Sequence, residues 1–97
     1  MIILKACVGK VTDYTKLKEV LYEELSQKRI DGVLIEVENP SLYVYFRNKT
    51  NMILESIDQR VRGVIVLKNQ DENPLKEFYK TTFENIVIKD ITHRLLI

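Results

Sequence analysis

The sequence predicts a single small α+β domain that spans residues 1–97. Three observations predict it: the length suits one hydrophobic core, 45% of the residues are hydrophobic and 30% are charged, and alternating apolar segments are interleaved with segments of helical periodicity. This mixture is typical of a globular chain and lacks the composition of a disordered one. We therefore expect the chain to fold as one unit around one core.

Charge and cysteine content narrow the class of protein. Lys and Arg number 15 against 14 for Asp and Glu, so the formal net charge of +1 creates no strong field toward phosphate backbones or anionic lipid. The single cysteine, Cys7, excludes an internal disulfide and a paired-cysteine zinc site. The segment Gly9-Lys10-Val11-Thr12 lacks the residue order of a phosphate-binding loop. No apolar run reaches membrane-spanning length, so we expect a cytoplasmic protein without membrane, cofactor or metal.

Periodicity divides the chain into expected strands and helices. Alternation of apolar and polar residues predicts a strand, and apolar residues spaced three and four apart predict a helix. The expected strands are residues 2–8, 33–38, 42–47, 64–68 and 86–90, and the last is expected to continue through Thr92, His93 and Arg94. The expected helices are residues 13–29 with Thr12 or Asp13 as the cap, a second from Asn48 or Thr50 to about Gly63, and a third beginning at Asn73-Pro74 and anchored by Leu75, Phe78 and Tyr79.

The segment Asn39-Pro40-Ser41 decides the expected topology. Proline fixes its own φ and asparagine favours the entry to a turn, so the chain is expected to return as a hairpin into the strand 42–47. Residues 1–68 then have the order βαββαβ, which is that of the ferredoxin-like plait. A helix and a strand are appended at the C-terminal end. The complete expectation is a five-stranded mixed sheet.

This topology leaves one face of the sheet without helices. If the strand order is 4-1-3-2 with the last strand outside the fourth, right-handed crossovers place all the helices on the opposite face. The bare face carries Tyr43, Tyr45 and Arg47 beside Lys5, and a surface so apolar usually marks an interaction site. In the alternative topology, the last strand lies at the other edge and the third helix covers the tyrosines in a doubly wound sheet.

The function favoured by the sequence is that of a non-catalytic interaction domain. It is expected to self-associate, as a homodimer, or to dock to a protein partner through the bare face. Lys5, Tyr43, Tyr45 and Arg47 are the predicted interface or ligand-binding residues, because tyrosine and arginine are preferred anchors of interfaces. The apolar end Leu95-Leu96-Ile97 is expected to be tied down, since a chain end otherwise frays; pairing with a second copy and packing within the same chain are equally consistent with this.

A DNA- or RNA-binding function is the first alternative. Tyr43 and Tyr45 have the one-apart spacing of the aromatic residues on which RNA-recognition domains stack bases. Lys5 and Arg47 would supply positive charge beside them. A dimer would double the local basic patches around Arg60, Arg62 and Lys68.

A small enzyme of unknown type is the second alternative. Glu36 and Glu38 share one strand face after Asp31, which resembles the acidic metal cluster of restriction-type nucleases, but the lysine expected after such a pair is absent. His93 is the only histidine and is expected to be a half-exposed strand residue. Cys7 is expected to be a small core residue and not a reactive thiol. Since no acid, base and nucleophile converge, the sequence disfavours catalysis.

Overall fold

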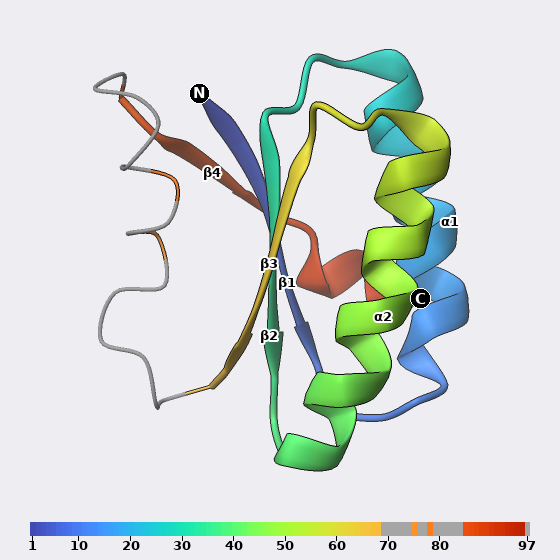
Figure 1. Cartoon of the computed structure of the whole chain (residues 1–97). Helices are drawn as coiled ribbons and strands as arrows, with labels where there is room; N and C mark the ends of the chain where they lie inside the picture. The colour runs from blue at the N-terminus through green and yellow to red at the C-terminus, as the bar shows by residue number, and fades with distance from the viewer. Residues whose placement is uncertain (69–74, 76–77, 79–84, 97) are drawn as a thin grey trace.

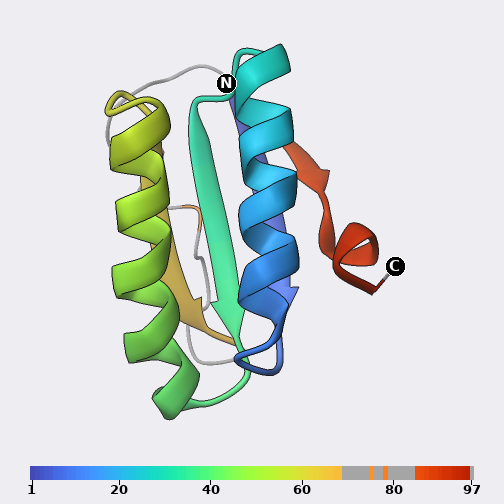
Figure 2. The same cartoon turned by 90° about the vertical axis from the view of Figure 1, so that its right-hand side faces the viewer.

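The computed structural model describes residues 1–68, 75, 78 and 85–96. Its centre is a four-stranded sheet with the order β3-β2-β1-β4, in which every neighbouring pair is parallel. The helices α1 and α2 lie side by side on one face of this sheet, and the short 3-10 helix η1 follows β4 on the same side (Figures 1 and 2). The bounds are β1 (Ile2–Val8), α1 (Asp13–Gln27), β2 (Gly32–Val37), α2 (Pro40–Ile57), β3 (Arg62–Leu67), β4 (Val87–Asp90) and η1 (Thr92–Leu96).

The expected ferredoxin-like plait with a five-stranded mixed sheet is wrong, because residues 42–47 are helical. They belong to α2, which begins at Pro40 directly after the cap residue Asn39. The side chain of Asn39 accepts a hydrogen bond from the Leu42 amide at 3.1 Å. Proline is well suited to the first helical position, because the amide that it lacks would have no partner within the helix. The segment that resembles a turn is therefore a helix start, and no hairpin forms.

The buried residues of α2 explain why the helical pattern prevails. Leu42, Phe46, Thr50, Ile53 and Leu54 are buried and lie three or four residues apart, so they form one stripe against the sheet. The expected second helix is the C-terminal part of this longer one. The alternation read in residues 42–47 covers too few residues to distinguish a strand from one and a half helical turns.

The other elements keep their expected places with small changes. The strands β1, β2 and β3 coincide with the segments expected at 2–8, 33–38 and 64–68 to within two residues. The last strand ends at Asp90, after which the chain turns into η1 instead of continuing as a strand. The expected third helix lies outside the described residues apart from Leu75 and Phe78.

The sheet has apolar clusters on both faces. The larger one joins the helices to the sheet and includes Leu4, Val8, Leu21, Ile35 and Phe46. The smaller one, on the reverse face, is formed by Ile3, Leu34 and Phe78, with Met1, Val64, Val66, Leu75 and Ile86 packed against it. This part of the reverse face is therefore not bare, which corrects the expectation of an uncovered apolar surface.

The last strand lies at the edge opposite β3, as in the alternative topology, but its neighbour there is the first strand. β4 pairs with β1, at the sheet edge opposite β3. Of the chain between β3 and β4, the structure describes Leu75 and Phe78, and both pack on the reverse face of the sheet, where Phe78 is buried against Ile3 and Leu34. Among the described residues, no helix is long and apolar enough to cross a membrane.

Candidate association surface

The four predicted interface residues do not come together. Lys5 lies in β1 on the reverse face of the sheet, where its ammonium is 3.3 Å from Glu36 Oε1. Tyr43, Tyr45 and Arg47 lie in α2, on the other side of the sheet. A helix turns by about 100° per residue, so Tyr43 and Arg47, one turn apart, share one side of α2, whereas Tyr45 lies on another side.

Tyr45 is held within an aromatic cluster between the two helices. Its ring centre lies 5.9 Å from that of Tyr14 and 5.3 Å from that of Phe46, in edge-to-face geometry. Lys49 Nζ lies 5.6 Å from the ring centres of both tyrosines. These contacts give Tyr45 a role in packing α1 against α2.

Cys7 and Glu36 face each other across β1 and β2 on the reverse face. The thiol of Cys7 donates a hydrogen bond to Glu36 Oε2 at 3.6 Å. Burial raises the pKa of Cys7, and the negative charge of Glu36 raises it further. The thiol is therefore protonated at neutral pH, the less reactive form. Within the described part of the chain, no group of three or more His, Cys, Asp or Glu residues is placed to hold a metal ion.

Two amides of the loop after β1 already donate to a carboxylate of the chain itself. Asp13 Oδ2 accepts hydrogen bonds from the amides of Gly9 at 3.0 Å and of Lys10 at 3.2 Å. A carboxylate of the chain itself thus occupies the position that an anion would take at the start of α1.

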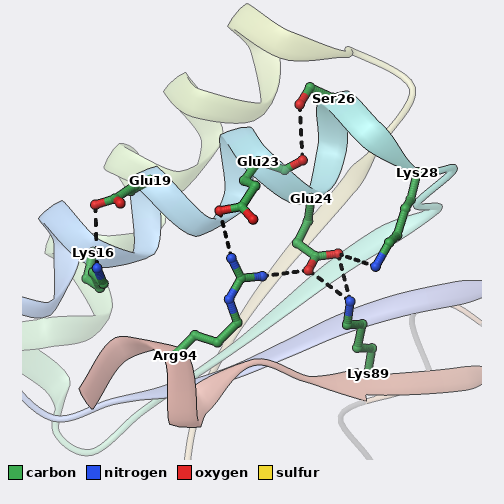
Figure 3. Close-up of polar contacts among 8 residues, drawn as sticks. All are labelled: Lys16, Glu19, Glu23, Glu24, Ser26, Lys28, Lys89 and Arg94. Atoms are coloured by element: carbon green, nitrogen blue, oxygen red, sulfur yellow. Dashed lines mark hydrogen bonds and ion pairs between the residues drawn. The ribbon is translucent and has the colours of Figure 1, made fainter. Parts of the chain in front are cut away.

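An ion cluster ties the C-terminal elements to α1 (Figure 3). The Glu24 side chain is only 5% exposed, and its carboxylate accepts hydrogen bonds from Lys89 in β4 at 2.8 Å and from Arg94 in η1 at 2.6 Å. Lys28 adds an ion pair at 3.5 Å, and Arg94 also binds Glu23 at 2.8 Å. Burial by itself raises the pKa of Glu24, but the hydrogen bond and charge of Lys89 outweigh burial, so the pKa is lowered. Because these charges satisfy one another, the cluster is a structural clamp.

The two edges of the sheet differ in length and charge. β4 has four residues, of which Lys89 and Asp90 are charged, and short charged strands are a common protection against edge-to-edge pairing. β3 is longer, and from Gly63 to Leu67 it carries no charged side chain. Among the described residues, its only ladder is the one with β2.

The backbone of β3 directs alternate residues toward the open edge. Arg62 donates its amide to the Asp31 carbonyl at 3.2 Å, and Lys68 donates to the Val37 carbonyl at 2.8 Å. In a parallel pair, the amide and carbonyl of every second residue bond to the neighbouring strand. The residues whose amides and carbonyls point away from β2 are therefore Gly63, Ile65 and Leu67. Among the described residues, no other strand bonds to the outward amides and carbonyls of these three residues, and their side chains are uncharged.

A hollow of about 450 Å³ adjoins this edge. Gly63 forms part of its wall, and a Cβ at that position would lie 2.6 Å from Leu54 Cδ1, so the Leu54 side chain of α2 occupies the space beside this glycine. The hollow is lined by Asn51, Leu54, Glu55, Gln59, Val61 and Gly63. We call the open side of β3 together with this hollow the β3 edge.

A second hollow, of about 580 Å³, lies at the ends of the strands where β2 and β3 begin, and it is lined mainly by charged residues. Those charges pair with each other. Arg60 forms two side-chain hydrogen bonds with Asp58, both at 3.1 Å, and Arg29 lies 3.5 Å from Asp31. The side-chain hydrogen bond from Arg60 is the main reason that the pKa of Asp58 is lowered. The charged groups of this hollow are therefore less available to a ligand than the outward backbone groups of the β3 edge.

No protein-family model, curated protein or solved structure matches this chain. The site must therefore be argued from its own geometry. Sequence reasoning overlooked the β3 edge because it placed the corresponding strand beside the first one with another strand outside it. The sequence Gly63-Val-Ile-Val-Leu could have indicated this site, because it has no charged residue and is more typical of an interior strand than of a sheet edge.

Proposed function

We propose that this protein is a small interaction domain that self-associates through the β3 edge. The observation that carries the proposal is the combination of outward-directed backbone groups at Gly63, Ile65 and Leu67 with the absence of charged side chains between Arg62 and Lys68. Strand addition to such an edge gains main-chain hydrogen bonds, and side-chain hollows beside it supply selectivity. The proposal keeps the function expected from the sequence and moves it from the face of the sheet to its edge.

Apolar burial supports the same surface. Ile65 and Leu67 pack against the main core but are only half-buried. A second strand laid along β3 would remove more of their surface from water, a gain of about 25 cal/mol for each Å² of apolar area. Solvent reaches these side chains because they lie at the open side of the sheet.

Nucleic-acid binding has less support from the geometry. Tyr45 packs inside the aromatic cluster between the helices, and Arg60 is bound to Asp58. Lys5 lies across the sheet from Tyr43 and Tyr45, so these side chains do not form a common stacking surface. Retention on a DNA or RNA column that falls steeply with salt would favour this alternative over the proposal.

Sedimentation velocity over a range of protein concentrations tests the proposal. We expect the wild-type chain to sediment as a dimer at high concentration, with little change between roughly 0.1 M and 1 M salt, because the surface is apolar. Ile65→Lys places a charge on the β3 edge and should give a monomer, and a circular dichroism spectrum that matches the wild type shows that the fold tolerates the charge at this half-buried position. Val87→Lys makes the same change on β4 at a side chain that is 60% exposed, and it should leave the dimer intact. A wild-type chain that stays monomeric at about millimolar concentration would refute self-association.

A further inference from the structure

We infer that β4 and η1 form a latch that opens as one unit while the rest of the fold stays intact, and that the closed latch covers the edge of β1. The latch comprises residues 87–96 and lies at the sheet edge beyond β1 (Figure 2). Apart from it, α1, α2 and the strands β1, β2 and β3 share the main core and their own ladders. This device is independent of association through the β3 edge.

The latch buries few apolar side chains. Val87 is 60% exposed and Ile88 is 39% exposed, and the buried apolar side chains of the latch are Ile91 and Leu95. The apolar side chains of β2, by contrast, are at most 1% exposed. A segment with few buried apolar contacts opens at a lower free energy than the whole fold. We therefore expect the latch to open well before the central strands separate.

Polar contacts attach both parts of the latch to the same neighbours. Glu24 of α1 accepts hydrogen bonds from Lys89 in β4 and from Arg94 in η1, so one carboxylate joins both parts to the helix. Thr92, at the start of η1, accepts the Cys7 amide of β1 at 2.9 Å. Because β4 and η1 share the Glu24 carboxylate and the strand β1, we expect them to open together.

The closed latch covers backbone groups of β1. The Lys5 carbonyl accepts the Ile91 amide at 2.8 Å, and the Cys7 amide donates to the latch as well, so the odd-numbered residues of β1 face the latch. The even-numbered residues face β2, as the Val8 carbonyl does when it accepts the Glu38 amide at 3.3 Å. β1 carries a single charged residue. Opening the latch therefore turns an interior strand into a second open edge of the sheet.

Thiol labelling tests whether the latch opens by itself. In a Cys7→Ser background, Ile91→Cys places a thiol at a buried position of the latch, and Val33→Cys places one in β2, on the far side of β1. The probe is Ellman's reagent, which reacts only with an exposed thiol. Urea below the unfolding transition should speed the labelling of Val33→Cys steeply and that of Ile91→Cys only slightly, because opening the latch exposes less surface than unfolding the whole chain.

Two further substitutions separate opening of the latch from unfolding of the whole chain. Asn39→Ala weakens the start of α2, away from the latch (Figure 2), so it should speed the labelling of Val33→Cys about fivefold and leave that of Ile91→Cys unchanged. Glu24→Gln removes the shared carboxylate and should speed the labelling of Ile91→Cys about tenfold. Glu19→Gln, at an exposed position of α1, is the control and should change neither rate.

Equal responses of the two thiols to urea and to Asn39→Ala would show that the latch opens only when the whole chain unfolds, and would overturn the inference. If Ile91→Cys loses its fold, hydrogen exchange of the wild-type chain decides. The Cys7 amide, which donates to Thr92, should then depend weakly on urea, whereas the Ala6 amide, which faces β2, should depend on it steeply. A steep dependence at both amides would contradict the latch.

Discussion

Phe78 packs against Gly32 on the face of the sheet that α1 and α2 leave open. A Cβ on Gly32 would overlap the ring at Cε1 and would lie 2.9 Å from Ile3 Cδ1. The ring is 1% exposed, so it uses the space that the missing side chain provides. This contact connects a residue from the stretch between β3 and β4 with the first residue of β2 and covers part of the reverse face.

Gly32→Ala should destabilise the fold, because the added methyl group collides with the buried Phe78 ring. Overpacking of this kind costs about 1–3 kcal/mol. Gly9→Ala is the matched control, since its Cβ would meet only the end of the Glu38 side chain, an exposed residue that can move away. Urea unfolding checks the difference. Equal midpoints for the two variants would show that Phe78 does not pack where the structure places it.

Asn39→Ala should weaken the start of α2. The Asn39 side chain accepts the Leu42 amide at 3.1 Å, and loss of such a cap costs about 1 kcal/mol. Thr12 occupies the corresponding position before α1, but its side chain makes no capping hydrogen bond, so Thr12→Ala should be nearly neutral. Thermal unfolding of the two variants checks this contrast. A neutral Asn39→Ala would argue that the helix does not begin at Pro40, and would reopen the hairpin interpretation.

Glu24→Gln should loosen the attachment of β4 and η1 to α1. The substitution leaves Lys89 and Arg94 without the carboxylate to which both donate, and hydrogen bonds of this charged kind contribute about 2 kcal/mol to the free energy of unfolding. Glu19→Gln is the control, because Glu19 is 65% exposed and its pairing with Lys16 at 3.7 Å should contribute little. Hydrogen exchange should show the loss first in the amides of β4.

The pKa of Glu24 gives this clamp a pH dependence of known sign. Burial opposes the ionised form, but Lys89, Lys28 and Arg94 lower the pKa below its ordinary value of 4.5. A carboxyl group whose pKa is lowered by folding contributes its full stabilisation when the pH is above its ordinary pKa. That stabilisation is lost as the pH falls through the pKa of the folded state. The difference in free energy of unfolding between the wild type and Glu24→Gln should therefore be constant near neutral pH and shrink below about pH 4.5. A difference that grows on acidification would contradict the ion cluster.

The sequence predicted most elements correctly because their patterns are long or unambiguous. Residues 2–8 alternate over a full strand, and residues 13–27 maintain an apolar stripe over four turns. The segment 42–47 was misassigned because Leu42 and Phe46 satisfy the spacing of a helix while Leu42, Val44 and Phe46 satisfy that of a strand. Asn39-Pro40 could have decided the matter, since it is as typical of a helix start as of a turn.

The candidate site depended on this one assignment. Placing residues 42–47 in the sheet put Tyr43, Tyr45 and Arg47 on its bare face, and moving them into α2 separated Tyr45 from Lys5 by the thickness of the sheet and a helix layer. The strand at 62–67 was expected close to its actual place in the chain, but its edge position follows only from the strand order. Strand order depends on contacts between distant segments, which periodicity does not report.

Hydrogen exchange at two neighbouring amides of β3 tests the central claim most directly. The Val64 amide points toward β2 and should be protected at every protein concentration, whereas the Ile65 amide points to the open edge. Self-association through this edge predicts that Ile65 exchanges quickly in dilute protein and becomes strongly protected as the concentration rises. Rapid exchange at Ile65 under conditions where the protein is dimeric would show that the two copies meet elsewhere and would contradict the account.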